Sequence, residues 1–329
     1  VDGRRLNRPP PIHCQYERYA MTESGLAETA PRQTRRQRRW QLSDNAIRWL
    51  FVAPTLLLLV AFAIYPFLRS MYISFTQYSV VVHEAPVWVG IQNYVELLTD
   101  DRMWLYFTIT GRYALVTVAL QTIVGFSLAM LVRDRFKGSG FVTTLMLVPM
   151  MLSPVVVGMF WKLMFNPGFG IFNYLIGQGG QGSDWLGDST LAFWAVVIVD
   201  VWMWSPFVML LCLSGLRAIP EYLYEAAVID RASSWFQFWR ITVPQVMPLL
   251  LIAVLFRAVE AIKAFDLMWV LTKGGPGDST ELIAVNLYRQ AFLGQFRTGR
   301  AAALAYIIWM IIIGVSSVLI ARINKSRSE

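Results

Sequence analysis

The apolar runs of this chain constrain its fold more than any other feature. Charged residues make up only 15% of the 329 residues, against roughly 25% in a typical soluble domain. The apolar residues gather into runs of about twenty or more, the length that a helix needs to cross a bilayer. Backbone groups in lipid must form their hydrogen bonds internally, so each run is expected to be helical. The chain is therefore predicted to be an all-α polytopic membrane protein with six transmembrane helices, near residues 47–69, 106–132, 141–164, 190–216, 245–272 and 301–322.

Positive residues flank these runs asymmetrically. Lys and Arg precede the first run and follow the second, fourth and sixth runs, whereas residues 165–189 contain neither. The positive-inside rule therefore predicts that both termini lie in the cytoplasm, together with residues 217–244. Arg289, Arg297 and Arg300 fall on the outer side in this topology and go against the rule.

Composition also excludes several functional classes. The net charge of +8 allows nucleic-acid binding, but the basic run at residues 32–39 stands just before the first predicted span, where it sets orientation. The residues Cys14, Cys212, His13 and His83 are too few and too scattered for a metal site or a disulfide. No nucleophile motif or acid–base cluster indicates an enzyme, and no cofactor is expected.

Three parts are predicted along the chain. Residues 1–46 form a basic N-terminal tail, residues 47–322 a transmembrane domain, and residues 323–329 a cytoplasmic tail. Residues 1–20 lack an initiator Met, and we interpret them as an artefact or an upstream extension before Met21.

The outer segments are expected to be short. Residues 70–105 suit a strand-like entry and a surface helix, and residues 165–189 include a Gly-rich turn. Residues 273–280, KGGPGDST, suit a turn, followed by a helix over residues 281–292. The turn lacks the Gly-Lys-Ser/Thr ending of a phosphate-binding loop, so any ATP hydrolysis is expected in another chain.

Residues 217–244 predict a cytoplasmic helix–turn–helix. Pro220 suits the first turn of a helix, which is expected to reach about Asp230. Ser234 and Gln237 have the spacing of a capping box that opens a second helix. Pro244 is expected to end that second helix, because it lacks an N–H donor and disfavours helix just before it.

The stretch EAAVIDRASSWFQFWRITVP, residues 225–244, resembles the EAA loop of bacterial ABC importer permeases. The family pattern has EAA, three residues, Gly, nine residues, an aliphatic residue, one residue, Leu and Pro, and this chain departs from it at Arg231 and Val243. Because Arg tolerates positive φ poorly, Arg231 argues against a left-handed turn there. The resemblance implies that the loop grips an ATPase subunit through Glu225, Ala226, Ala227, Asp230, Arg231 and Pro244. The alternative is an amphipathic connector lying in the membrane interface.

Two further stretches resemble sugar-importer permeases of the maltose-transporter type. They are FVAPTLLLLVAFAIYPFLRSMYISF in the first run, and LTKGGPGDSTELIAVNLYRQAF followed by GRAAALA near the end, so that the likeness covers roughly residues 47–322. The ending INKSRSE lacks the tail of the second permease type, which favours the first type.

This resemblance implies an inner-membrane subunit of an ATP-driven carbohydrate importer that works by alternating access. Its implied partners are a second homologous permease, two ATPase subunits, and a periplasmic or lipid-anchored solute-binding protein. The transported solute is either a neutral oligosaccharide or an acidic one, such as a uronate or alginate-type oligomer. A secondary transporter or channel without an ATPase partner is the alternative function.

The fifth predicted span carries alternating charges three residues apart, from Arg257 to Asp266. One charge at a helix centre costs about 2.5–3.5 kcal/mol, so four charges need a reason. They form either a self-neutralising ladder against neighbouring helices or a polar wall of the translocation pathway, and the two readings are compatible. The resemblance places substrate contacts on the fourth and fifth spans, which makes the pathway candidates Glu260, Lys263, Asp266, Arg257, Asp200, Trp202 and Trp204. Weaker candidates are Trp161, Lys162, Arg112 and Gln121.

Overall fold

The computed structural model describes residues 43–81, 85–134, 136–175, 183–294 and 296–328. His13, Cys14, His83 and most of the predicted N-terminal tail lie outside these residues, as does the Gly-rich segment 176–182. The chain divides into two compact units, residues 1–60 and residues 61–329, and each is described by itself.

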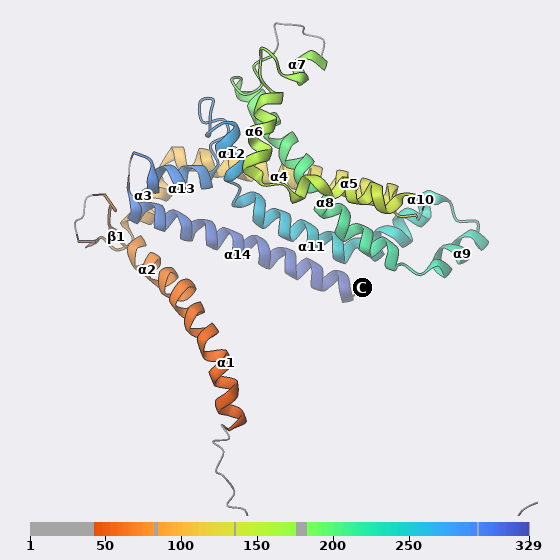
Figure 1. The fold of residues 1–329 in the computed structure, drawn as a ribbon, viewed down its shortest axis with the longest axis horizontal. Coiled ribbons are helices and arrows are strands. Elements are labelled where there is room, and N and C mark those ends of the chain that lie inside the picture. The colour runs from red at the N-terminus through yellow and green to blue at the C-terminus, as the bar shows by residue number, and fades with distance from the viewer. Residues whose placement is uncertain (1–42, 82–84, 135, 176–182, 295, 329) are drawn as a thin grey trace, which may run out of the picture. The chain divides into compact units, whose positions relative to one another are not determined.

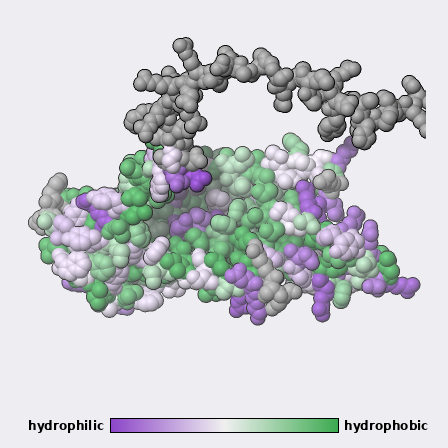
Figure 2. All heavy atoms as spheres, turned by 90° about the horizontal axis from the view of Figure 1, so that it is seen from below, coloured by the Kyte–Doolittle hydropathy of each residue, from purple (hydrophilic) through white to green (hydrophobic). Residues whose placement is uncertain are grey.

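The prediction of an all-helical membrane protein is confirmed. Within the described residues, five helical stretches are long and apolar enough to cross a membrane, namely Arg48–Ser74, Asp101–Leu131, Ser189–Ala218, Ser234–Ile262 and Thr298–Lys325. Apolar side chains cover much of the face shown in Figure 2, as expected for helices that contact lipid.

The third predicted span is bent. It consists of α5 (Ser139–Met151) and α6 (Pro154–Met164), whose axes meet at 95°. Pro154 disfavours helical backbone in the residue before it, and Leu152 and Ser153 are both extended. The described residues therefore contain six candidate spans only when this bent pair is counted as one.

Two spans accommodate a proline by widening one helical turn. The π-helical turn η2 (Val60–Ile64) joins α1 (Asp44–Leu59) to α2 (Tyr65–Ser74), two residues before Pro66. The turn η3 (Phe238–Thr242) precedes Pro244 at the start of α11 (Val243–Ile262) in the same way. A proline cannot donate its backbone N–H and its ring clashes with the carbonyl four residues earlier, and a widened turn relieves both problems. The prediction that Pro244 ends a helix is therefore wrong.

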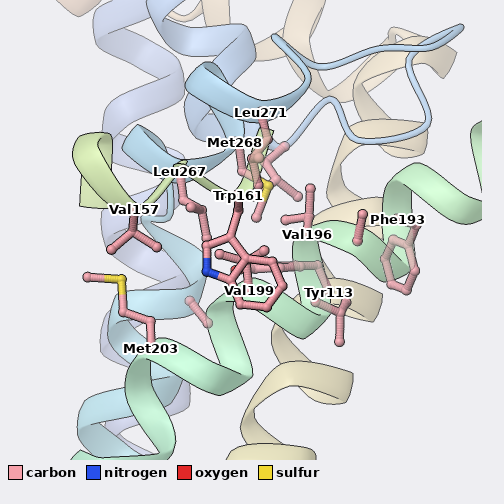
Figure 3. Packing of buried hydrophobic residues seen from close by; sticks show 14 of the residues in the cluster. Tyr113, Val157, Trp161, Phe193, Val196, Val199, Met203, Leu267, Met268 and Leu271 are labelled. Atoms are coloured by element: carbon pink, nitrogen blue, oxygen red, sulfur yellow. The ribbon is translucent and has the colours of Figure 1, made fainter. Parts of the chain in front are cut away.

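Four long helices of the second unit pack against one another. They are α4 (Asp101–Leu131), α8 (Ser189–Ala218), α11 and α14 (Thr298–Ser328), which lie side by side (Figure 1). Helix α8 packs against α4 and α11, and α14 packs against α11. Of the apolar stretch of α8, 61% is buried, the largest share among the described spans. Trp161 of α6 belongs to the largest buried cluster, with Val157, Leu267 and Met203 on one side of its ring and Val196 and Phe193 on the other (Figure 3).

The close approach of α4 and α8 depends on a glycine. A β-carbon at Gly125 of α4 would lie 2.6 Å from Cβ of Val208 and 2.7 Å from the backbone oxygen of Ser205. Both neighbours belong to α8, and one of them is backbone that cannot rotate away. The absence of a side chain at Gly125 therefore sets the distance between the two helices.

Short elements gather at the two ends of the second unit (Figure 1). At one end lie the strand β1 (Thr76–Gln77) and helices α3 (Gln92–Thr99) and α13 (Ile283–Phe292), with β1 paired antiparallel to β2 (Val87–Trp88). The strand-like entry and surface helix predicted in residues 70–105 are therefore confirmed. At the other end lie α9 (Glu221–Ile229), α10 (Ser234–Gln237) and the C-terminus, while α7 (Ile171–Leu175) and α12 (Asp266–Leu271) complete the described helices.

The predicted turn at residues 273–280 is stabilised around a buried carboxylate. Gly274 has φ +90°, and its missing side chain leaves room for the carboxylate of Glu281. Arg289 donates to that carboxylate over 2.9 Å and to the carbonyl of Lys273 over 2.9 Å. Burial raises the pKa of the Glu281 carboxyl, and the Arg289 guanidinium opposes that rise.

A substitution at Gly125 tests the packing of α4 on α8. Gly125→Ala should lower the midpoint of thermal unfolding, because overpacking costs about 1–3 kcal/mol, and the gain of about 1 kcal/mol in helix propensity offsets only part of it. The measurement is thermal unfolding of the purified protein in detergent. Gly111→Ala on the same helix is the control, since no atom lies within 4 Å of its added carbon, and it should be neutral or stabilising. Equal midpoints for the two variants would contradict the close approach.

Candidate coupling loop and translocation pathway

The turn after α9 is a Schellman motif. Ala232 N–H donates to the carbonyl of Ala227 over 2.9 Å, and Arg231 N–H donates to the carbonyl of Val228 over 3.0 Å. Arg231 occupies the left-handed position of this motif with φ +53°. The expectation that Arg231 argues against a left-handed turn is therefore wrong. The two hydrogen bonds hold the backbone at the position where the EAA pattern has Gly.

The second helix of the loop begins one residue earlier than predicted. Ser233 is its N-cap, and its hydroxyl oxygen accepts from the N–H of Phe236 over 3.2 Å. Gln237 does not complete a capping box but donates to the carbonyl of Ala232 over 3.0 Å. Helix α10 then passes through η3 into α11, so the second helix of the loop and the fifth span form one helical stretch, Ser234–Ile262.

Three contacts fix the loop to the membrane helices. The hydroxyl of Tyr224 on α9 lies 2.9 Å from that of Thr242 in η3. The guanidinium of Arg133, just after α4, lies 4.3 Å from the ring centre of Tyr224. Arg217, near the end of α8, donates to the carbonyl of Val132 over 3.1 Å. Displacement of α9 would therefore act on the end of α4 through Arg133 and on η3, which continues into α11, through Thr242, while the bond of Arg217 ties the ends of α8 and α4 together.

The outward surface of the loop combines apolar and charged side chains. Glu225, Ala226, Asp230 and Arg231 are exposed, whereas Ala227 is buried against the neighbouring helices. Large apolar side chains are exposed beside them, namely Tyr222, Val228, Ile229, Trp235, Phe236 and Trp239. Such an exposed apolar surface rimmed by charges is typical of a protein-binding site.

Three spans meet at a buried polar network. Arg257 of α11 lies 3.5 Å from the carboxylate of Asp200 on α8 and donates to Oε1 of Gln121 on α4 over 2.9 Å. Gln121 also donates to the Asp200 carboxylate over 2.8 Å. The guanidinium of Arg257 lies 4.5 Å from the ring centre of Trp204. The side chains of Arg257 and Asp200 are only 4% and 6% exposed, so this ion pair is an internal connection between helices.

The other charged pathway candidates lie outside this buried network. Lys263 and Glu260 form an exposed ion pair of 2.8 Å at the end of α11. The chain leaves helical geometry after Ile262, so Asp266 starts the separate helix α12 and is exposed. The four charges predicted on one face of one helix therefore do not share a face. Arg257 belongs to a buried ion pair, Glu260 and Lys263 form an exposed ion pair, and Asp266 lies on another helix.

The aromatic and weaker candidates divide between packed and exposed positions. Trp161 is 7% exposed, and its ring centre lies 5.5 Å from that of Trp202, which is itself 41% exposed. Lys162 is exposed, and Arg112 lies over the ring of Phe193 at 4.5 Å. Sequence reasoning missed Tyr224, Thr242 and Arg133 as anchors of the coupling loop. The position of a basic residue directly after a span was the only available signal for Arg133.

Comparisons with known proteins agree with this geometry. The family described as the inner membrane component of binding-protein-dependent transport systems matches residues 121–329. A trehalose/maltose transport system permease protein from Thermococcus litoralis is 36% identical over 79% of this chain and 88% of its own length. A probable starch degradation products transport system permease protein from Thermoanaerobacterium thermosulfurigenes is 32% identical over 85% of this chain and 94% of its own length. The crystal structure of a bacterial ABC transporter for the acidic polysaccharide alginate has a chain with the same fold, with TM-score 0.74, 19% identity, and 85% and 95% coverage.

The helical spans of this chain, with a helix–turn–helix at one end, have the architecture of an ABC permease. This chain belongs to the family of inner membrane components of binding-protein-dependent transport systems. It is a multi-pass transport component of the inner membrane, as the EAA-like loop implied. The alternative of a secondary transporter or channel receives no support from any of these comparisons.

The Schellman motif generates a stability prediction. Arg231→Gly should stabilise the protein by about 1 kcal/mol or less, because Gly adopts positive φ without steric cost. Arg231→Val should destabilise it, since a β-branched residue resists that conformation. Thermal unfolding of both variants measures the effect, with Arg240→Gly in the helical η3 turn as the control that should destabilise. A destabilised Arg231→Gly variant would show that the Arg side chain, and not the backbone, dominates at this position.

The buried network generates a second prediction. Arg257→Met should destabilise the protein by about 3–5 kcal/mol, because it leaves the Asp200 carboxylate buried without its partner. Lys263→Met removes an exposed partner and should cost about 1 kcal/mol or less. Adding Asp200→Leu to Arg257→Met should restore part of the lost stability, which thermal unfolding of the three variants would measure. The absence of any rescue would mean that the pair is not the dominant interaction of either residue.

Proposed function

We propose that this chain is the first permease subunit of an ATP-driven carbohydrate importer. It pairs with a second, homologous permease, and the two rest on two ATPase subunits in the cytoplasm. A periplasmic or lipid-anchored binding protein delivers the solute from outside. The observation that carries the proposal is the exposed surface of α9 and the following turn, where apolar side chains surround Glu225, Asp230 and Arg231.

The position of this surface supports a cytoplasmic ATPase partner. Helices α9 and α10 share one end of the second unit with the C-terminus (Figure 1). The loop after α4 carries Arg133 and Lys137, and the positive-inside rule assigns such a loop to the cytoplasm. We therefore assign both termini and residues 217–244 to the cytoplasmic side.

Alternating access follows from the continuity of the loop with the fifth span. When ATP closes the ATPase subunits, they push on α9 and its turn. The displacement passes through α10 and η3 into α11, because these form one helical stretch. It also reaches α4 and α8 through the contacts of Tyr224, Arg133 and Arg217. The spans then rock, and the central cavity opens outward to receive the solute.

A carbohydrate substrate is supported by the nature of the relatives and by the pathway candidates. The named relatives are permease proteins of a trehalose/maltose transport system and, probably, of a transport system for starch degradation products, and the chain with the same fold comes from a transporter involved in the import of alginate. On this chain the exposed members of the candidate set are Glu260, Lys263, Asp266 and Trp202. Aromatic faces and alternating charges accommodate both neutral and acidic sugars, so both remain part of the proposal. Arg257, Asp200 and Trp204 contribute by positioning the helices that carry these residues.

Loss of Glu225 tests the coupling role. Glu225→Ala should reduce solute uptake by about tenfold or more at unchanged protein level, because a charge-assisted contact is worth about 1.5–3 kcal/mol. Uptake and ATPase activity of the reconstituted transporter would be measured together, with Glu221→Ala at the start of the same helix as the control. Unchanged uptake in Glu225→Ala would remove the proposed role.

The substrate class is tested by stimulation of ATP hydrolysis. The chain is co-expressed with its neighbouring permease, ATPase and binding protein, and neutral and acidic oligosaccharides are compared. Stimulation by either class confirms an importer and names its substrate, and Lys263→Gln should weaken stimulation only by an acidic one. Failure to assemble with any ATPase would contradict the proposed function.

A further inference from the structure

The exposed apolar side chains of the candidate coupling loop fall into two groups. Val228 and Ile229 lie on α9, which stands farther out from the long helices than α10 does (Figure 1). Trp235, Phe236 and Trp239 lie on α10 and η3, which continue into the fifth span. The second group therefore belongs to a helix that enters the membrane, whereas the first group lies outside that helix.

The second group forms one stripe together with a basic residue. Trp235, Phe236, Trp239 and Arg240 are all exposed and recur at the spacing of one helix face. Phe238, between them in the sequence, is only half-buried and turns its ring toward α4. We call the four exposed residues the aromatic stripe. It is apolar over three positions and ends in a guanidinium.

Ring contacts place the aromatic stripe beside the end of α4. The ring centre of Phe238 lies 6.0 Å from that of Phe126, which belongs to the last two turns of α4. The rings of Trp235 and Trp239 lie 6.0 and 5.1 Å from that of Phe238. Arg133 comes directly after α4, and a basic residue in that position marks the cytoplasmic face of the membrane. The stripe is therefore level with the last turns of a span.

The length of the helical stretch leads to the same level. Helix α11 has 20 residues, and at about 1.5 Å per residue it spans about 30 Å, the thickness of the hydrocarbon core. The whole stretch Ser234–Ile262 has 29 residues. The residues before Val243, which carry the stripe, therefore extend into the headgroup layer on the side of the coupling loop.

Charge favours lipid over a protein partner for the stripe. Residues 234–243 contain no Asp or Glu, and Arg240 is their only charged residue. The cytoplasmic leaflet carries anionic lipids, which attract basic side chains near its surface. By contrast, α9 and its turn expose the carboxylates of Glu221, Glu225 and Asp230, which such a leaflet repels. The same loop thus presents one surface suited to lipid and another suited to a protein.

The residue types of the stripe suit the boundary between acyl chains and headgroups. An indole ring is apolar but carries one N–H donor, and Trp accordingly concentrates at both membrane–water interfaces. An amphipathic helix with aromatic and basic residues lies in this layer, with its apolar face about 5–10 Å into the headgroup/acyl boundary. Two tryptophans, a phenylalanine and an arginine on one helix face meet this requirement.

We propose that the aromatic stripe anchors the coupling loop in the phospholipid headgroup layer of the cytoplasmic leaflet. The indole rings lie at the acyl boundary, and the guanidinium of Arg240 meets lipid phosphates. This anchor rests on the proposed function for the side of the membrane and for the ATPase that meets α9. Because α10 and η3 keep their depth in the membrane, a push on α9 tilts the fifth span instead of driving it through the bilayer.

Photo-crosslinking in the assembled transporter identifies what touches the stripe. Trp239→p-benzoylphenylalanine is made in the full chain, which is co-expressed with its partner subunits and reconstituted in nanodiscs of phosphatidylglycerol and phosphatidylethanolamine. After irradiation, the mass of this chain should increase by that of one phospholipid. The matched control carries the same label at Ile229 of α9, which is also exposed and should crosslink to the ATPase instead.

The two labels separate the anchor from the proposed function. A lipid adduct at position 239 supports the anchor even if the label at position 229 captures no ATPase, a result that would count against the proposed function alone. A crosslink from position 239 to the ATPase or to the second permease in place of lipid would overturn the anchor. The absence of any lipid adduct at position 239 would overturn it equally.

Quenching of tryptophan fluorescence measures the depth of the stripe without a crosslinker. The double variant Trp235→Tyr/Trp239→Tyr keeps an aromatic ring at both positions, and its difference from the wild-type emission isolates the two indoles. In the reconstituted transporter this difference should be quenched most by lipids brominated near the headgroup. Strongest quenching by aqueous iodide, or by lipids brominated near the chain end, would overturn the proposal.

Discussion

Every backbone polar group of a membrane span must be satisfied within the protein, and most of this structure follows from that constraint. It makes each long apolar run helical, and it restricts how a proline can be accommodated. At Pro66 and Pro244 the helix widens into a π-turn and continues, whereas at Pro154 it breaks and bends by 95°. The difference bears on the proposed coupling, because the continuous stretch at Pro244 joins the candidate coupling loop directly to the fifth span.

Local sequence patterns predicted the local features well. The apolar runs located the second, fourth and sixth spans to within about five residues, and the residues around Gly274 indicated a turn. The fifth span, predicted at residues 245–272, instead runs over Ser234–Ile262, because the helix starts earlier in the loop and breaks before Lys263. The EAA-like spacing from Glu225 to Pro244 identified the family that the comparisons then established. These features depend on residues close together in sequence, where propensity and spacing carry the information.

Contacts between residues far apart in the sequence could not be predicted from the sequence. Asp200, Gln121 and Arg257 lie on three different spans, and nothing in their spacing indicates that the helices meet at that depth. The charges of the fifth span looked like one face because the break after Ile262 has no Gly or Pro to mark it. Arg231 was misjudged because propensity disfavours positive φ, while the two hydrogen bonds of the Schellman motif determine the backbone there.

The arginines that depart from the positive-inside rule also show that tertiary contacts can override a rule based on local sequence. The rule describes how spans are oriented during insertion, when the residues act as isolated charges. In the folded chain Arg289 and Arg300 have specific partners in Glu281 and Asp100, and they lie where two helices begin. Their positions are thus determined by tertiary contacts at that end of the unit. Charge in this protein therefore acts in two ways: it links spans through the buried pair of Arg257 and Asp200, and it holds Arg289 and Arg300 through pairs with Glu281 and Asp100.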